Sequence, residues 1–177
     1  LAPIAKIIDD NLGLKRGFMT TIHSYTKDQN LVDATHKKDY RRGRAAASNI
    51  VPTTSGASLA VGQVIPKLKG KLHSEAARVP VIDGSVIYLV CEIKKKKTVE
   101  KINKIFKKSS QKKYKGILEY SEEPIVSSDV IGNLHAAVFD SLLTQIDGDL
   151  LKVVAWYDNE MGYSFQLVQL IKKFSKK

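Results

Sequence analysis

His23 is the residue in this sequence best suited to acid–base chemistry. It lies in a run, Gly17–Asp28, that also carries several hydroxyl side chains. The imidazole pKa lies near neutral pH, so a histidine can accept and return a proton without extreme tuning. The one cysteine, Cys91, shares a strand face with apolar residues, which favours a buried position over a nucleophilic role. On pattern alone, His23 is either a base without an identified partner or a histidine hydrogen-bonded within a sheet.

Four arginines form a second group of candidate functional residues. Arg41, Arg42 and Arg44 lie in one cluster, Arg78 is isolated, and all four lie near hydroxyl-bearing stretches. A planar guanidinium forms paired, charge-assisted hydrogen bonds with phosphate oxygens better than a lysine ammonium does. The net charge of +11 is compatible with nucleic acid, acidic lipid or a phosphorylated small molecule as partner.

The lysines, in contrast, gather in runs at 94–97, 107–108, 112–115 and 172–177. Such runs flank or end the expected elements and are usually solvated surface. No recognisable nucleic-acid-binding motif accompanies them. We therefore expect no nucleic-acid partner.

Length and composition indicate one soluble globular domain. The 177 residues are 43% hydrophobic and 27% charged, which is enough to bury a core. No apolar run approaches the roughly 20 residues that span a bilayer, and the first residues lack the features of a secretory signal. A single cysteine fits a reducing compartment, so we expect a cytoplasmic protein without a membrane partner.

The elements that must position these residues follow from periodicity and turn signals. An apolar stripe predicts a helix over residues 1–12, ended by Gly13, and alternation predicts a strand over 17–25. An irregular segment follows over 26–54, and Ser55 is placed to cap a helix over 57–65. Asp83-Gly84 predicts a hairpin between strands at 76–82 and 85–93.

The second half alternates in the same way. Thr98 caps a lysine-rich amphipathic helix whose apolar positions include Val99 and Phe106, and a final helix begins near Asn159. Further strands are expected at 116–120, 125–128, 134–143 and 150–157. The expected fold class is therefore α+β, with a mainly antiparallel sheet covered by helices on one face. The sequence has no Gly-x-Gly-x-x-Gly loop and no metal-spaced His/Cys cluster.

Several ordered blocks along the whole chain resemble the phosphorylating glyceraldehyde-3-phosphate dehydrogenase family. These blocks are Leu1–Lys6, Met19–His23, Arg41–Ala46, Asn49–Ala57, Gly70–Leu72, Arg78–Pro80, Lys115–Leu118 and Trp156–Ser164. The resemblance covers only that family's catalytic domain. It implies that residues 1–177 form one catalytic and substrate domain, truncated within the helix that follows the family's nucleophilic cysteine, without the dinucleotide-binding domain. We expect the chain alone to be inactive as a dehydrogenase.

The resemblance also implies a reaction and roles for particular residues. In the family, a thiolate attacks the aldehyde, a nicotinamide cofactor takes the hydride, and inorganic phosphate cleaves the thioester to give an acyl phosphate. His23 matches the general base. Thr26 and Arg78 match the site for the substrate phosphate. Arg42, Ser55 and Gly56 match the site for the attacking phosphate, with Ser55 in place of the usual threonine.

Asn159 and Tyr163 match the residues that position the nicotinamide ring. The cofactor is NAD or NADP, which the family binds mainly through its other domain. The expected partners are glyceraldehyde 3-phosphate, inorganic phosphate and, in the intact enzyme, the other subunits of a homotetramer.

Each residue also has a structural interpretation. Ser55 suits a helix cap, Arg42 a surface position, Arg78 an ion pair and Thr26 a turn; Asn159 suits helix initiation and Tyr163 an ordinary surface aromatic.

Three alternative functions remain. The related erythrose-4-phosphate dehydrogenase is the closest, although the blocks 52–57 and 117–120 resemble the glycolytic enzyme more. A basic nucleic-acid-binding module and an assembly scaffold are the other two.

Overall fold

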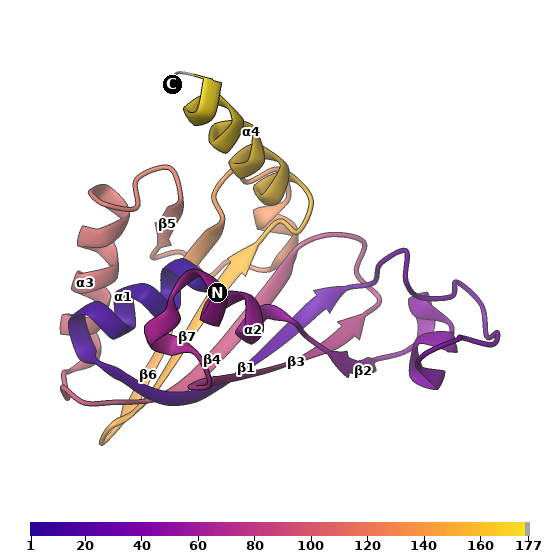
Figure 1. Ribbon diagram of the computed structural model, residues 1–177, viewed down its shortest axis with the longest axis horizontal. Helices are drawn as coiled ribbons and strands as arrows, with labels where there is room; N and C mark the ends of the chain where they lie inside the picture. The colour runs from indigo at the N-terminus through magenta and orange to yellow at the C-terminus, as the bar shows by residue number, and fades with distance from the viewer. Residues whose placement is uncertain (176–177) are drawn as a thin grey trace.

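The structure is a computed structural model that describes residues 1–175, so Lys176 and Lys177 of the C-terminal lysine run lie outside it. A seven-stranded sheet has the order β2-β3-β1-β4-β7-β6-β5 (Figure 1). The strands are β1 (Leu14–Ser24), β2 (Val51–Thr54), β3 (Leu72–Val79), β4 (Ser85–Ile93), β5 (Leu118–Ser121), β6 (Ala137–Asp147) and β7 (Leu150–Tyr157). The α-helices are α1 (Ala2–Leu12), α2 (Ala57–Val64), α3 (Val99–Gln111) and α4 (Met161–Ser175).

The core lies between one face of the sheet and helices α1, α2 and α3. Ile4 and Ile8 of α1, Phe106 of α3 and Leu89 of β4 are fully buried in one cluster. Phe18 of β1 is 70% exposed on the opposite face. Two strand pairs, β1–β3 and β5–β6, are parallel and the other pairs are antiparallel. The predicted α+β class, with helices on one face of a mainly antiparallel sheet, is confirmed.

The helix and strand that lead to His23 are close to their predicted bounds. Pro3 lies in the first turn of α1, where its missing N–H has no helical partner to lose. Gly13 ends the helix with φ 73°, a left-handed conformation that glycine adopts without strain. Strand β1 begins at Leu14 rather than Gly17, and its last residues carry His23 to the end of the sheet.

The predicted hairpin at Asp83-Gly84 is wrong. Strand β1 lies between β3 and β4, pairing parallel with β3 and antiparallel with β4. The Pro80–Gly84 segment therefore connects two strands that do not pair with each other. Gly84 has φ 84°, and a Cβ there would lie 2.2 Å from the Ser127 carbonyl oxygen. The Asp83-Gly84 dipeptide thus lies where the backbone passes close to Ser127. It carries no information about which strands pair.

Two other segments differ from expectation. Residues 125–128 do not form a strand, because the Asp129 carboxylate accepts the Val126 N–H at 2.7 Å and closes a 3-10 turn, η4 (Ser127–Val130). Within the segment expected to be irregular, β2 pairs antiparallel with β3, and two 3-10 turns, η1 (Tyr40–Gly43) and η2 (Ala46–Ser48), precede it.

Helix α4 extends away from the sheet (Figure 1). Its apolar stripe is largely exposed, with Val168 at 45% and Phe174 at 66%. Among the helices of residues 1–175, none has the length and apolar character needed to cross a membrane.

Candidate functional site

His23, Arg78, Ser55 and Gly56 line one hollow of about 370 Å³, here called the His23 hollow. His23 comes from the end of β1, and Arg78 is its register partner on β3. Ser55 and Gly56 immediately precede α2. Leu1, at the start of α1, lines the same hollow. Four of the residues proposed from the sequence are therefore brought together from three elements.

The surroundings of His23 favour a neutral imidazole. Burial, the largest influence, lowers its pKa, and the Arg78 cation acts in the same direction, while the Ser24 carbonyl opposes them. The Nδ1 atom lies 2.7 Å from the Ser24 carbonyl oxygen and contacts the Arg78 guanidinium. The Tyr157 ring packs edge-on at 5.9 Å between centroids. A neutral imidazole beside an open hollow can accept a proton at neutral pH.

Arg78 is half-buried and faces the His23 hollow. Its Nη1 atom donates to the Ser24 carbonyl oxygen at 3.1 Å, and burial lowers the pKa of the guanidinium. Among residues 1–175 it forms no ion pair with a carboxylate, so the interpretation of Arg78 as an ion-pair partner finds no support. A half-buried cation without an acidic partner is a suitable ligand for an anion.

The N-terminus of α2 supplies backbone donors at the same hollow. Gly56 occupies the N-cap position for which Ser55 was expected, and the Ser55 hydroxyl accepts the Ala57 N–H at 3.3 Å. A Cβ on Gly56 would meet nothing within 4 Å, so this backbone is open to approach. N–H groups at a helix start attract anions. Here the Ser58 N–H donates to Ser74 Oγ at 3.1 Å, so an anion at this helix start would exchange with the two serine hydroxyls.

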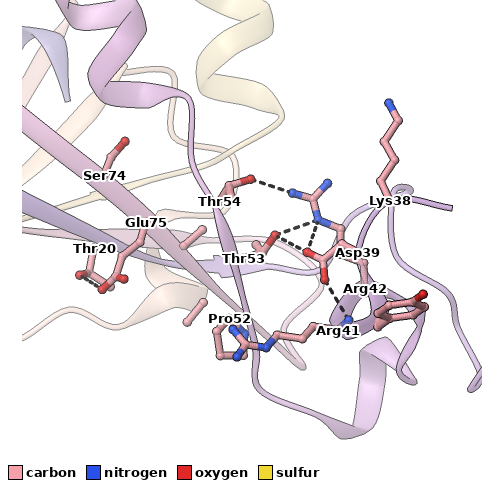
Figure 2. A pocket seen from close by; sticks show the side chains of 13 residues that line it. Thr20, Lys38, Asp39, Arg41, Arg42, Pro52, Thr53, Thr54, Ser74 and Glu75 are labelled. Atoms are coloured by element: carbon pink, nitrogen blue, oxygen red, sulfur yellow. Dashed lines mark hydrogen bonds and ion pairs between the residues drawn. The ribbon is translucent and has the colours of Figure 1, made fainter. Parts of the chain in front are cut away.

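Arg42 lies in a neighbouring hollow of about 1040 Å³, here called the Arg42 hollow (Figure 2). Its guanidinium donates to Thr53 Oγ1 at 2.8 Å and Thr54 Oγ1 at 3.2 Å, and it forms ion pairs with Asp28 and Asp39. Thr54 lines both hollows. Arg42 is thus adjacent to the His23 hollow, and two carboxylates balance its charge.

Thr26 lines neither hollow. Its carbonyl oxygen accepts the Gln29 N–H at 2.9 Å, and its own N–H donates to Gln29 Oε1 at 3.2 Å. The structure places Thr26 in a turn two residues after the end of β1.

Asn159 lies between β7 and α4, and Tyr163 lies in the first turn of α4. The amide oxygen of Asn159 accepts the hydroxyls of Ser24 and Ser85, both at 2.9 Å. These two contacts fix the amide plane and identify the nitrogen as its donor end. Tyr163 is 71% exposed.

Two residues near the site were not identified from the sequence. Tyr157 lines the His23 hollow, and its hydroxyl lies 2.9 Å from Thr21 Oγ1. The alternation of β7 places Tyr157 on the same face as the buried Val153, which is a usable signal. Asp28, the ion-pair partner of Arg42, carries no comparable signal, because the pairing depends on how the loop folds back.

Cys91 is confirmed as a core residue. It is 1% exposed, and burial raises the pKa of its thiol to about 12. A thiol in such surroundings stays protonated and is a poor nucleophile. The one thiol of this sequence is therefore no candidate reaction partner for His23.

Comparison of the sequence with known proteins identifies the family of this chain. Residues 1–159 match the family model of the glyceraldehyde 3-phosphate dehydrogenase C-terminal domain. The chain belongs to this family. Among relatives within the family, the glyceraldehyde-3-phosphate dehydrogenase of Mycobacterium avium is 54% identical over 99% of the chain. That of Priestia megaterium is 51% identical over 100% of the chain, and glyceraldehyde-3-phosphate dehydrogenase 1 of Bacillus subtilis is 50% identical over 100%. The chain spans about half the length of these relatives, 52% of the first and 53% of the other two.

Proposed function

We propose that this chain is the catalytic half of a phosphorylating glyceraldehyde-3-phosphate dehydrogenase, with His23 as its general base. The observation that carries the proposal is the His23 hollow, where a histidine of lowered pKa faces an arginine and a helix N-terminus. Family membership supports the same activity. We extend the proposal to a cytoplasmic homotetramer and to residues 1–177 as one catalytic domain.

His23 has the surroundings that a base needs in this reaction. A neutral imidazole can take the proton of a thiol and return it when the product leaves. The family's cysteine is expected just before Leu1, and Leu1 lines the His23 hollow. A thiol at that place would lie close to His23 and to the N-terminus of α1, whose dipole favours the thiolate.

The two phosphate groups of the reaction fit two sets of donors. Arg78, with Thr26 from the adjacent turn, would bind the substrate phosphate. Arg42, Ser55 and Gly56 would bind the attacking phosphate between the two hollows. In this assignment Arg42 exchanges part of its contact with Asp28 for the phosphate, because each nitrogen of its guanidinium already has a partner in the structure.

The nicotinamide end of a cofactor fits the donor set at Asn159. With its amide oxygen held by Ser24 and Ser85, the Asn159 nitrogen can donate to a carboxamide oxygen. The exposed ring of Tyr163 offers a packing surface for a planar group. NAD or NADP, when bound, supplies the hydride acceptor for the oxidation.

Substitution of His23 in the intact enzyme tests the proposal. We expect His23→Asn to lower kcat by about 10²- to 10⁴-fold, the usual contribution of a general base, with little change in substrate KM. The matched control is His73→Asn, because His73 is an exposed histidine on the open face of the same sheet. An equal loss in both variants, or an unchanged kcat for His23→Asn, would contradict the proposal.

We also propose that the 177 residues by themselves do not form acyl phosphate, since their one thiol is the inert Cys91. The measurement is phosphate-dependent oxidation of glyceraldehyde 3-phosphate by the purified chain. Turnover that survives removal of host enzyme would refute it.

A further inference from the structure

The loop that carries Arg42 has little regular secondary structure to hold its shape. It runs from the end of β1 at Ser24 to the start of β2 at Val51, and its regular pieces are the short turns η1 and η2. A loop of this length keeps one conformation where side chains supply hydrogen bonds to its backbone groups. His36, within this loop, makes three such bonds.

The partners of His36 determine which ring nitrogen carries the hydrogen. Nδ1 faces the Asp39 N–H at 3.1 Å and the Lys38 N–H at 3.3 Å, and Nε2 faces the Asp28 carbonyl oxygen at 3.1 Å. A backbone N–H donates and a carbonyl accepts, so Nδ1 is the acceptor and Nε2 the donor. The side chain is 14% exposed. The neutral ring is therefore the form that fits all three partners.

Two of these partners also hold Arg42. Asp39 caps η1, since its carboxylate accepts the Arg41 N–H at 2.9 Å and its carbonyl oxygen accepts the Arg42 N–H at 3.0 Å. The same carboxylate lies 3.4 Å from Arg42 Nε (Figure 2). Asp28 pairs with Arg42 through Oδ2, while its Oδ1 lies 3.8 Å from His36 Nε2. His36 thus connects the two segments that hold the Arg42 guanidinium.

A proton on His36 would disturb both segments. Histidine takes up a proton between about pH 5 and pH 8. A hydrogen on Nδ1 would point at two N–H donors, so both bonds would be lost, and the charged ring would compete with Arg42 for Asp28. The charged groups around the ring, from the turn after β1 and from the start of η1, are Asp28, Asp39, Lys37, Lys38 and Arg42. Two carboxylates favour the charged ring and three cations oppose it, so the backbone donors decide for the neutral form.

We propose that His36 is a positioning residue for Arg42, whose neutral imidazole holds the loop in the conformation that presents the guanidinium to the attacking phosphate. This inference rests on the proposed assignment of Arg42 to that phosphate. Within residues 1–175, His36 lines neither hollow, so it acts through Asp28 and Asp39. Release of Asp28 from Arg42 would favour phosphate by up to about threefold, whereas two lost hydrogen bonds weaken the ordered loop by at least about tenfold. Protonation of His36 should therefore weaken phosphate binding.

The test compares the KM values for inorganic phosphate and glyceraldehyde 3-phosphate in the intact enzyme at about pH 6 and about pH 8. Phosphate and His23 also titrate, so the measure is the ratio of phosphate KM between variant and wild type at the same pH. His36→Phe fills the space without accepting an N–H. It should raise the phosphate KM about 3- to 10-fold at the higher pH and leave the KM for glyceraldehyde 3-phosphate within about twofold. At the lower pH the ratio should approach one, because the wild type has lost the same bonds.

A conservative variant separates the hydrogen bonds from the charge. The amide oxygen of asparagine lies near the position of a histidine Nδ1 and accepts N–H groups without titrating. His36→Asn should have the wild-type phosphate KM at about pH 8 and a KM about threefold below wild type at about pH 6. The matched control is His73→Phe, since His73 stacks on Phe18 at 5.3 Å on the open face of the sheet. It should change neither KM at either pH.

Hydrogen exchange in the intact enzyme gives a readout that does not depend on activity. The protection factors of the Lys38 and Asp39 amides should fall on acidification in the wild type and stay constant in His36→Asn. Arg42→Leu, measured alongside, should raise the phosphate KM more than His36→Phe does.

Two kinds of failure are distinguishable. If Arg42→Leu leaves the phosphate KM unchanged, the assignment of Arg42 is wrong and the role of His36 fails with it. If Arg42→Leu raises that KM but His36→Phe does not, only the role of His36 is overturned. The same holds if the two amides stay protected in the wild type at about pH 6, or if His36→Phe raises both KM values equally, as general unfolding would.

Discussion

Arg78 and Arg42 stand on two sides of the candidate site and are held in opposite ways. Arg78 is half-buried beside His23 and has no carboxylate partner among residues 1–175. Arg42 is bound by two threonine hydroxyls and two carboxylates. An unneutralised, partly desolvated cation binds an anion strongly, whereas a neutralised one exchanges partners at little net gain. Under the proposed assignment, this difference would suit a substrate phosphate held on Arg78 through the reaction and a second phosphate that enters and reacts on Arg42.

Loss of Arg78 should have the largest effect. In the intact enzyme we expect Arg78→Leu to lower kcat/KM for glyceraldehyde 3-phosphate by about 10²- to 10³-fold, because removing one partner of a desolvated charge pair costs about 2–5 kcal/mol. Steady-state kinetics measure it. Arg16→Leu, which removes an exposed arginine paired with Glu92, should leave kcat/KM unchanged. If Arg78→Leu changes kcat/KM by less than about threefold, Arg78 does not bind the substrate more strongly than a neutralised arginine would, and the contrast with Arg42 is lost.

Release of Arg42 from its carboxylate should have a smaller effect in the opposite direction. We expect Asp28→Asn to lower the KM for inorganic phosphate by about threefold, since an exposed ion pair contributes at most about 1 kcal/mol. Asp33→Asn is the control, because Asp33 pairs with Arg44 at 3.2 Å in the same loop. If the KM for phosphate rises instead, Asp28 orients Arg42 more than it neutralises it.

The two arginines should also differ in their influence on the pH profile. The pKa of His23 is lowered first by burial and then by the Arg78 cation, so its protonation should reduce kcat/KM only below the usual pKa of 6.5. Arg78→Leu should raise the His23 pKa and move this acid limb to higher pH. Arg42 is not among the groups that shift His23, so Arg42→Leu should leave the limb in place. If the acid limb of the kcat/KM profile moves equally in the Arg78→Leu and Arg42→Leu variants, the two arginines influence the His23 pKa to the same extent and this contrast between them fails.

Local elements were predictable because their signals are local. Pro3 and Gly13 delimit α1, Thr98 caps α3, and the alternation around His23 places it on the face that leads to the hollow. The position of Arg78 opposite His23 depends on the parallel pairing of β1 with β3, which no nearby residue specifies. A turn dipeptide at Asp83-Gly84 has the same local chemistry whether or not the flanking strands pair.

The state of Arg42 was not predictable for a related reason. Three of its four partners come from 14 residues before it and from 11 and 12 residues after it, across a loop with little regular structure, and the fourth is Asp39, three residues before it. The sequence indicates that an arginine, two threonines and two aspartates are available. Their arrangement depends on a backbone that tertiary contacts with β2 and β3 determine.

The position of β1 between β3 and β4 has a consequence for folding kinetics. His23 and Arg78 are 55 residues apart in the chain, and their contact requires β3 to dock parallel to β1 across that distance. Closing so long a loop loses chain entropy before any contact compensates for it, so such pairings form slowly. A partly folded chain that has only the β6–β7 hairpin and α3 would have part of the core and the Tyr157 wall of the His23 hollow, but neither His23 nor Arg78 in place. In the intact enzyme, recovery of catalytic activity during refolding should therefore lag behind recovery of secondary structure.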